Sequence, residues 1–192
     1  GASLSTVPGA AAEKDWFDMY DTRQTALDKR TFNSWTQELG EITGEEAAEV
    51  HAINALAPFI INSQLKPLLL ALGPGETEAT RRRYVINVSA MEGQFYRFKS
   101  AKHPHTNMAK ASLNMMTRTA AQGYAKARIY MNAVDTGWIT DENPHDKASE
   151  RWAKGLTCPL DEIDAAARVL DLIYIQSEEY GKFWKDFREI PW

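Results

Sequence analysis

Two short apolar runs separated by a helical stretch are the feature that most constrains the fold of this chain. Residues 84–88 read Tyr-Val-Ile-Asn-Val and residues 129–134 read Ile-Tyr-Met-Asn-Ala-Val, and both are rich in side chains that favour strands. Residues 106–127 between them carry mostly side chains that favour helices. A strand, a helix and a second strand in this order predict a right-handed crossover between parallel strands. We therefore predict an α/β fold with both strands buried in a parallel sheet.

The segment before the first run predicts a long helix. Thr43-Gly44-Glu45-Glu46 has the spacing of a capping box and opens an apolar run that extends from Ala47 to about Leu72. Pro58 should kink or break this helix, and the Gly-Pro-Gly of residues 73–75 should end it. The three arginines at 81–83 are then expected to form a solvated turn into the strand rather than a phosphate site.

The segment after the second run predicts a further helix and a last strand. The helix should begin within residues 159–164, where proline and acids suit a first turn. Its apolar positions recur at threes and fours and predict one buried face: Ile163, Ala166, Ala167, Leu170 and Ile173. Residues 181–184 resemble a strand, which brings the sheet to about three strands. We predict an α/β domain over 41–192, preceded over 1–40 by a lead-in and an aromatic-rich loop or short helices.

Composition excludes several classes of function. Lys+Arg 22 against Asp+Glu 26 gives a net charge of -4, which argues against nucleic acid as a partner. The longest apolar stretch, around 55–61, is too short to cross a membrane. The single Cys158 excludes an intrachain disulfide and a cysteine-based zinc site, and suits a cytoplasmic location. The chain opens with Gly-Ala-Ser and without Met, which suggests that it was cut from a longer protein.

Four segments, in the right order, resemble the short-chain dehydrogenase/reductase family. They are the central-helix segment at 53–59, the serine-bearing strand end at 85–93, the Tyr-x-x-x-Lys helix at 106–113, and the strand with its Pro-Gly loop at 129–139. With the segments that follow, the resemblance covers roughly residues 43–190. It implies the C-terminal portion of a Rossmann-like parallel sheet with flanking helices, from which the N-terminal nucleotide-binding half is absent.

The resemblance also implies roles for individual residues. In the family a tyrosine passes a proton to or from the substrate, a lysine lowers the pKa of that tyrosine and holds the ribose, a serine positions the substrate, and an asparagine holds a water relay. Carried over by position, Lys110 and Asn54 match. Thr106 stands at the tyrosine, and an aliphatic hydroxyl has too high a pKa to replace a phenol. Ala90 stands at the serine, with Ser89 one residue earlier and expected on the opposite face.

Other residues extend this hypothetical site. Thr136, Gly137 and Ile139 fall in the loop that lies beside the nicotinamide in the family, with Thr136 in place of the usual proline. Tyr96, or His105 beside Thr106, could in principle supply a titrating group. For His103 and His105 we favour loop or capping roles over a catalytic or metal role, and we predict no metal.

Two functions remain open from the sequence. The chain is either a catalytically silent module for interaction or structure, or the C-terminal part of an NAD(P)-dependent oxidoreductase whose N-terminal half is missing or lies on another chain. No glycine-rich turn follows a strand, so we predict no cofactor for this chain and NAD or NADP for a completed domain. An incomplete sheet exposes an edge, so we expect either a homo-oligomer or a complex with the missing half.

Overall fold

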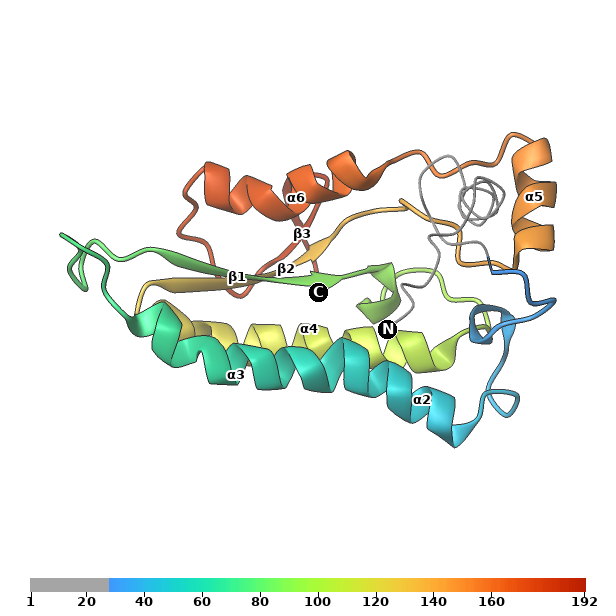
Figure 1. Ribbon diagram of the computed structural model, residues 1–192, viewed down its shortest axis with the longest axis horizontal. Coiled ribbons are helices and arrows are strands. Elements are labelled where there is room, and N and C mark those ends of the chain that lie inside the picture. Colours follow the sequence, from blue (N-terminus) through green and yellow to red (C-terminus); the bar gives the residue numbers. More distant parts are fainter. Residues whose placement is uncertain (1–27) are drawn as a thin grey trace, which may run out of the picture.

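The computed structural model describes residues 28–192, which form a sheet with helices on both faces (Figure 1). The strands are β1 (Arg83–Ser89), β2 (Ile129–Asp135), β3 (Phe183–Lys185) and β4 (Arg188–Ile190). The helices are α2 (Gly44–His51), α3 (Ala57–Leu70), α4 (Pro104–Ala125), α5 (His145–Ala153) and α6 (Glu162–Tyr174), with a π-helical turn η2 (Ala52–Leu56) and the 3₁₀ turns η1 (Ser34–Thr36) and η3 (Met91–Gly93). Helices α2, α3 and α4 cover one face of the sheet and α6 the other (Figure 1). The lead-in predicted for residues 1–27 lies outside the described residues, and the boundary at 40 stays a prediction.

The sheet has the order β1-β2-β3-β4. The first three strands are parallel, as predicted, and β4 pairs antiparallel with β3. Neither β4 nor α5 was predicted, because a three-residue strand and a nine-residue helix are too short for their periodicity to stand out. Asp186 and Phe187 form the turn between β3 and β4 with φ of 48° and 63°, so the chain reverses within two residues.

The long helix before β1 contains a widened turn. Helices α2 and α3 are continuous through η2, where the amide of Ala57 donates to the carbonyl of Ala52, five residues back. Pro58 explains this turn, because a proline ring clashes with the carbonyl four residues earlier, here that of Asn54. The predicted capping box is half formed. Thr43 accepts from the amide of Glu46, whereas the Glu46 carboxylate accepts from the Ser34 hydroxyl.

The core lies between α4 and the sheet. Every residue of β2 is buried, and Ala121 and Tyr124 of α4 pack against Ile129 and Met131. Polar side chains link three elements within this layer. Asn62 of α3 donates to Asn87 of β1 at 3.0 Å, and Asn87 donates to Thr117 of α4 at 2.9 Å. The strand–helix–strand unit predicted from the sequence is thus the centre of the molecule.

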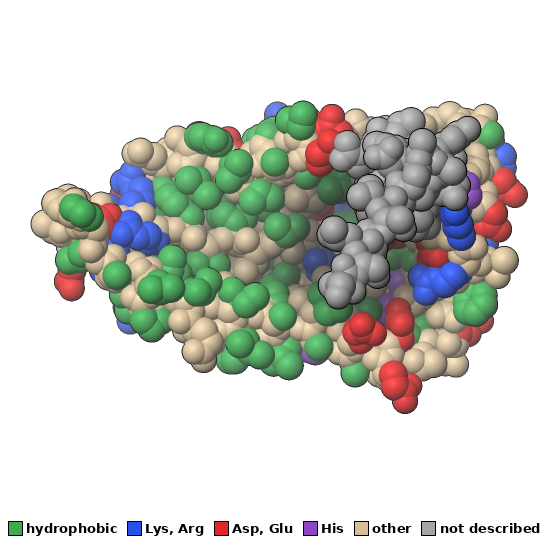
Figure 2. Space-filling model, viewed as in Figure 1, with side chains coloured by type: hydrophobic (Ala, Val, Ile, Leu, Met, Phe, Trp, Pro, Cys, Tyr) green, Lys and Arg blue, Asp and Glu red, His purple; other side chains and the backbone are tan. Residues whose placement is uncertain are grey.

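Two predictions of burial are wrong, and both concern the same side of the molecule. Strand β1 is only partly buried, with Val88 45% exposed, because it lies at the edge of the sheet. The predicted buried face of α6 is largely uncovered, with Ile163 73% exposed and Ile173 39% exposed. Figure 2 shows the consequence, since apolar side chains spread across this side over α6, along the β1 edge and over α3.

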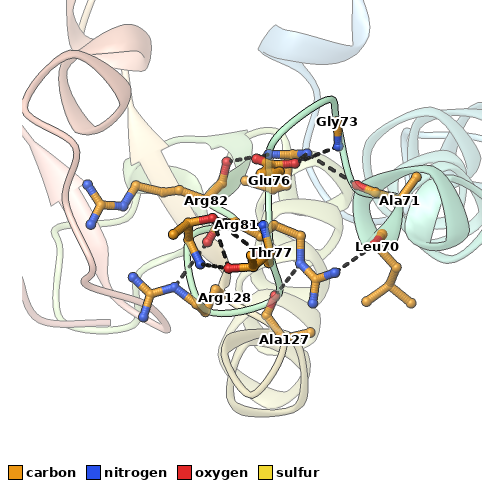
Figure 3. A network of polar contacts seen from close by, with 11 residues as sticks. Leu70, Ala71, Gly73, Glu76, Thr77, Arg81, Arg82, Ala127 and Arg128 are labelled. Atoms are coloured by element: carbon orange, nitrogen blue, oxygen red, sulfur yellow. Dashed lines mark hydrogen bonds and ion pairs between the residues drawn. The ribbon is translucent and has the colours of Figure 1, made fainter.

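The arginines at 81–83 make contacts within the fold, and Arg81 is buried (Figure 3). Arg81 is 5% exposed and donates to the carbonyls of Leu70 and Ala127, so it joins the ends of α3 and α4. Arg83 donates two hydrogen bonds to Glu76, which with the Gly73 amide hold the pKa of the Glu76 carboxyl at about 2. The prediction of a solvated turn is therefore wrong for Arg81. The preference against a phosphate site agrees with these contacts, because the donors serve partners within the fold.

Candidate functional site

The candidate site lies where the carboxyl ends of β1 and β2 meet. Ser89 is the last residue of β1 and pairs with Asp135, the last of β2. In open parallel sheets, ligands bind outside the carboxyl ends of the strands. Residues 90–93 and 136–139 follow Ser89 and Asp135 directly. The fold therefore brings together the two segments that resemble the family's serine-bearing strand end and its nicotinamide loop.

Lys110 reaches this site from α4. Its ammonium donates to the Val88 carbonyl at 3.1 Å, and Thr106 lies one helical turn earlier on the same face of α4. Burial lowers the pKa of Lys110, an effect that the charges of Glu92 and Asp135 oppose. A lysine in such surroundings is more easily deprotonated than one in water.

The Val88 carbonyl belongs to the open edge of β1. In a parallel pair, alternate residues direct both backbone groups toward the same neighbour. The Arg83 amide donates to Arg128, so the odd-numbered residues of β1 face β2. The backbone groups of Tyr84, Ile86 and Val88 therefore face the other edge, where no strand pairs among residues 28–192. Lys110 thus binds the Val88 carbonyl, and the other outward backbone groups of β1 pair with no strand among the described residues.

Asn54 lies close to Lys110 across a groove of about 330 Å³ that opens along β1. Val88 and Pro58 also line this groove. The Asn54 amide donates to the Val50 carbonyl at 3.0 Å, inside the widened turn η2. Widened turns of this kind are frequent at functional sites because they leave backbone carbonyls without helical partners. The structure therefore brings together the two residues that match the family's pattern.

The serine and tyrosine positions differ from these two. Ser89 is 2% exposed, and its hydroxyl is buried without a hydrogen-bond partner among the described residues. Ala90 follows with extended backbone and no hydroxyl. Tyr96 is 51% exposed, and its hydroxyl accepts from Gln94. The roles of these residues, like that of Thr106, stay predictions.

The last residue of β2 carries a charge whose contacts were not predicted from the sequence. Asp135 is 3% exposed and accepts from the Gly137 amide at 2.8 Å and from the Lys185 ammonium at 2.7 Å. Gly137 has a φ of 83°, a conformation that favours glycine, and a side chain there would also displace the end of the Leu160 side chain. Asp135 is the charged residue at the carboxyl end of β2, and this end of a parallel strand is a common place for functional side chains. Thr136 and Ile139 lie in the loop that follows β2, and their role beside a nicotinamide stays a prediction.

The two histidines before α4 have different surroundings. His103 precedes the helix with a φ of 42°, stacks on Trp35 at 3.8 Å and binds the Trp35 carbonyl through Nδ1 at 2.9 Å. These contacts hold His103 in the loop before α4, and its side chain makes no capping hydrogen bond to the helix. His105 is 5% exposed, and burial lowers its pKa. Residues 28–192 contain no group of three or more His, Cys, Asp or Glu that could hold a metal ion.

Comparisons with known proteins agree on the family. A family model described as Enoyl-(Acyl carrier protein) reductase matches residues 26–155, more than half of the chain. An uncharacterized protein of Acanthamoeba polyphaga mimivirus, R665, is 34% identical over 182 residues, which are 91% of this chain and 37% of that protein. The chain thus spans little more than a third of this relative.

Solved structures show the same fold. The NADPH-bound carbonyl reductase from chicken fatty liver is 21% identical, with a TM-score of 0.53 over 95% of this chain and 71% of that one. A short-chain dehydrogenase/reductase from Burkholderia multivorans with bound NADP is 19% identical, with a TM-score of 0.58 over 84% of this chain and 62% of that one. No helix in residues 28–192 has the length and apolar character needed to cross a membrane. The match to the family model and the shared fold together show that this chain belongs to the short-chain dehydrogenase/reductase family.

Proposed function

We propose that this chain is the C-terminal half of a short-chain dehydrogenase/reductase-type domain that is catalytically silent and acts through association. The observation that carries the proposal is the open edge of β1. Three residues of this strand present unpaired backbone groups, and the apolar side chains of α3 and α6 border them. A parallel strand with helices on either side of it would cover all of these groups at once.

The lack of the family's proton-donating tyrosine supports the proposal that the domain is catalytically silent. By the resemblance to the family, Thr106 stands at the position of the catalytic tyrosine, and it lies on α4 one turn before Lys110. Its hydroxyl does not ionise near neutral pH, so a completed site lacks the proton donor that the family uses. Asn54 and Lys110 would then be retained parts of the scaffold around the groove.

A nucleotide would need more than the described residues. As the resemblance implies, Lys110 and the loop of Thr136, Gly137 and Ile139 would contact the nicotinamide and its ribose. The Lys110 ammonium and the tight Gly137 loop fit such contacts. Residues 28–192 contain no strand that runs into a glycine-rich turn, so the pyrophosphate would depend on a preceding half. We therefore propose no cofactor for this chain, and NAD or NADP for a completed domain.

One observation favours the alternative of an active oxidoreductase. The pKa of Lys110 is lowered by burial at the carboxyl end of the sheet, where family members carry out proton transfer. In that case another group would replace the tyrosine, and Tyr96 is the available phenol. Its hydroxyl contacts Gln94, so it would have to change partner before it could act.

A comparison of two proteins tests the proposal. The chain alone and a chain extended by a nucleotide-binding half would be titrated with NADPH and NADH, followed by nucleotide fluorescence. We expect saturable binding only for the extended protein, and no turnover of a generic ketone by either. Saturable micromolar binding by the chain alone would contradict the proposed dependence on a preceding half. Turnover by the extended protein that disappears in Lys110→Met would favour the active alternative.

A further inference from the structure

A second groove lies along α4, apart from the open edge of the sheet. It encloses about 610 Å³ between one face of this helix and the 92–102 segment. Volumes of roughly 300–1,000 Å³ are typical of sites that bind small molecules. Among residues 28–192, none of β1 or α3 lines this groove. The association proposed for the open edge therefore does not use it.

The lining of the groove along α4 is apolar. Met108, Ala111 and Met115 lie at helical spacing on this face, and Phe95 lines the groove from the 92–102 segment. Phe95 is 88% exposed, Met108 52% and Met115 59%. From Pro104 to Met115, which both line the groove, the helix rises about 16 Å. The groove is thus long as well as apolar, and flexible methionine side chains can adapt to an extended apolar chain.

Several polar groups of the lining are occupied by contacts within the fold. The Lys99 ammonium donates to the carbonyls of Met91 and Glu92 at 2.7 and 2.8 Å. Burial lowers the pKa of Lys99, and the negative charge of Glu92 opposes this shift. The Asn107 amide donates to the His103 carbonyl at 3.0 Å. The charges of Lys99 and Glu92 therefore offset each other within the groove.

One end of the groove keeps a positive charge. Lys102 lines the groove beside Pro104, the first residue of α4, and its ammonium joins none of the ion pairs among residues 28–192. The amino end of a helix carries a partial positive charge, and the first turn of α4 contains no acidic residue. A backbone bridge to Glu38 holds Lys102 in place. The groove therefore combines a cationic end with an apolar length.

We propose that this groove binds a small amphiphile with one extended apolar chain and an anionic head, of the class of aliphatic carboxylates. The head would contact the Lys102 ammonium at the amino end of α4, and the chain would lie along Met108 and Ala111 toward Met115. The charged contact fixes the direction of the ligand, and burial of its chain supplies most of the affinity. Binding requires neither a nucleotide nor a preceding half, because neither contributes to this groove.

Isothermal titration calorimetry of the whole chain with sodium decanoate, below the concentration at which decanoate forms micelles, tests the inference. We expect saturable binding of one decanoate per chain. Decyltrimethylammonium has an apolar chain of the same length and a cationic head, and it should bind at least about tenfold more weakly. Acetate has the head without the chain and should show no saturable binding. An absence of saturable decanoate binding, or equal affinity for the decyl cation, would overturn the inference.

Two variants locate the bound chain. Lys102→Glu should weaken decanoate binding at least about tenfold without weakening the binding of the decyl cation. Ala111→Trp should abolish binding of both, because its ring would fill the groove. Phe59→Ser/Ile60→Ser is the matched control on α3, where the two side chains are 56% and 47% exposed, and it should bind decanoate as the natural chain does. Circular dichroism checks that each variant is folded.

Three results from these variants would contradict the inference. Decanoate binding that survives both Lys102→Glu and Ala111→Trp would place the ligand elsewhere. Binding lost only in the α3 variant would place it beside the open edge, which overturns the inference and leaves the open-edge proposal standing. Light scattering that gives twice the 21.6 kDa mass of one chain, together with no decanoate binding, would show that a second copy covers the groove. The nucleotide titrations of the extended protein are independent of all these results.

Discussion

The two edges of the sheet differ in how completely they are covered. At one edge, β4 folds back on β3, and Trp192 stacks on Phe183 at 5.5 Å and donates to the Gly181 carbonyl. At the other, the outward backbone groups of β1 have one polar contact among the described residues, the Lys110 ammonium on the Val88 carbonyl. A few residues can close an edge by a hairpin. The uncovered backbone is thus confined to the β1 edge, where we propose that a partner pairs.

The largest expected effect comes from removing a buried side chain at the closed edge and comparing the loss of stability with that of a similar change beside the open edge. Phe183 at the closed edge is fully buried, so Phe183→Ala should lower the free energy of unfolding by about 4 kcal/mol. Phe59→Ala beside the open edge should cost less than about 1 kcal/mol, because that ring is already 56% exposed. Urea titrations of both variants give the two values. Similar losses would mean that the open side is covered as well as the closed one.

A substitution of Arg81 tests whether its hydrogen bonds stabilise the ends of α3 and α4 on the open side of the sheet. Arg81→Met removes the donors to Leu70 and Ala127 and leaves carbonyls without partners at the ends of α3 and α4. We expect a loss of about 2 kcal/mol. Arg82→Met is the matched control, because its exposed pair with Glu178 should contribute less than about 1 kcal/mol. Equal effects of the two substitutions in urea titrations would contradict the structural role of Arg81.

The hairpin of the closed edge carries a small strain. Phe187 has a φ of 63°, which is costly for a bulky side chain, and its ring contacts the Arg168 guanidinium at 5.2 Å. Phe187→Gly removes both the strain and the contact, and we expect a net gain of roughly 0.5 kcal/mol in thermal or urea unfolding. Phe187→Ala keeps the strain without the ring and should destabilise the chain. A loss in Phe187→Gly as large as that in Phe187→Ala would show that the ring contact outweighs the strain.

Lys110 gives the smallest change in stability and a distinct change in association. Charged side chains, lysine above all, protect sheet edges from unwanted pairing. Lys110→Met should change the free energy of unfolding by less than about 1 kcal/mol and should increase the fraction of larger oligomers in sedimentation. Lys110→Arg keeps a donor for the Val88 carbonyl and should behave like the natural sequence. If Lys110→Met sediments as the natural chain does, the ammonium does not protect the edge.

The sequence predicts the centre of this fold well and its periphery poorly. The strand–helix–strand unit follows from the apolar runs at 84–88 and 129–134, because a buried strand and the helix beside it leave strong periodic patterns. The burial of β1 and α6 was predicted wrongly, since apolar periodicity shows which face needs cover and not whether the chain supplies it. β4 was missed because three residues carry no usable period.

The candidate site shows the same division. Asn54 and Lys110 were placed by their resemblance to the family, and the structure brings them to one groove. The Asp135–Lys185 pair joins residues fifty positions apart, so no local pattern indicates it. The open acceptor of Val88 depends on strand register, which is a property of the assembled sheet.

Amide hydrogen exchange along β1, followed residue by residue by NMR, tests the central claim most directly. If the edge is open, the amides of Tyr84, Ile86 and Val88 should exchange quickly, because they face away from β2. Those of Val85, Asn87 and Ser89 should be protected, because they face β2. The account predicts this alternation in the chain alone and its disappearance once a preceding half is attached. Equal protection of all six amides in the chain alone would show that the β1 edge is already paired, and would contradict the account.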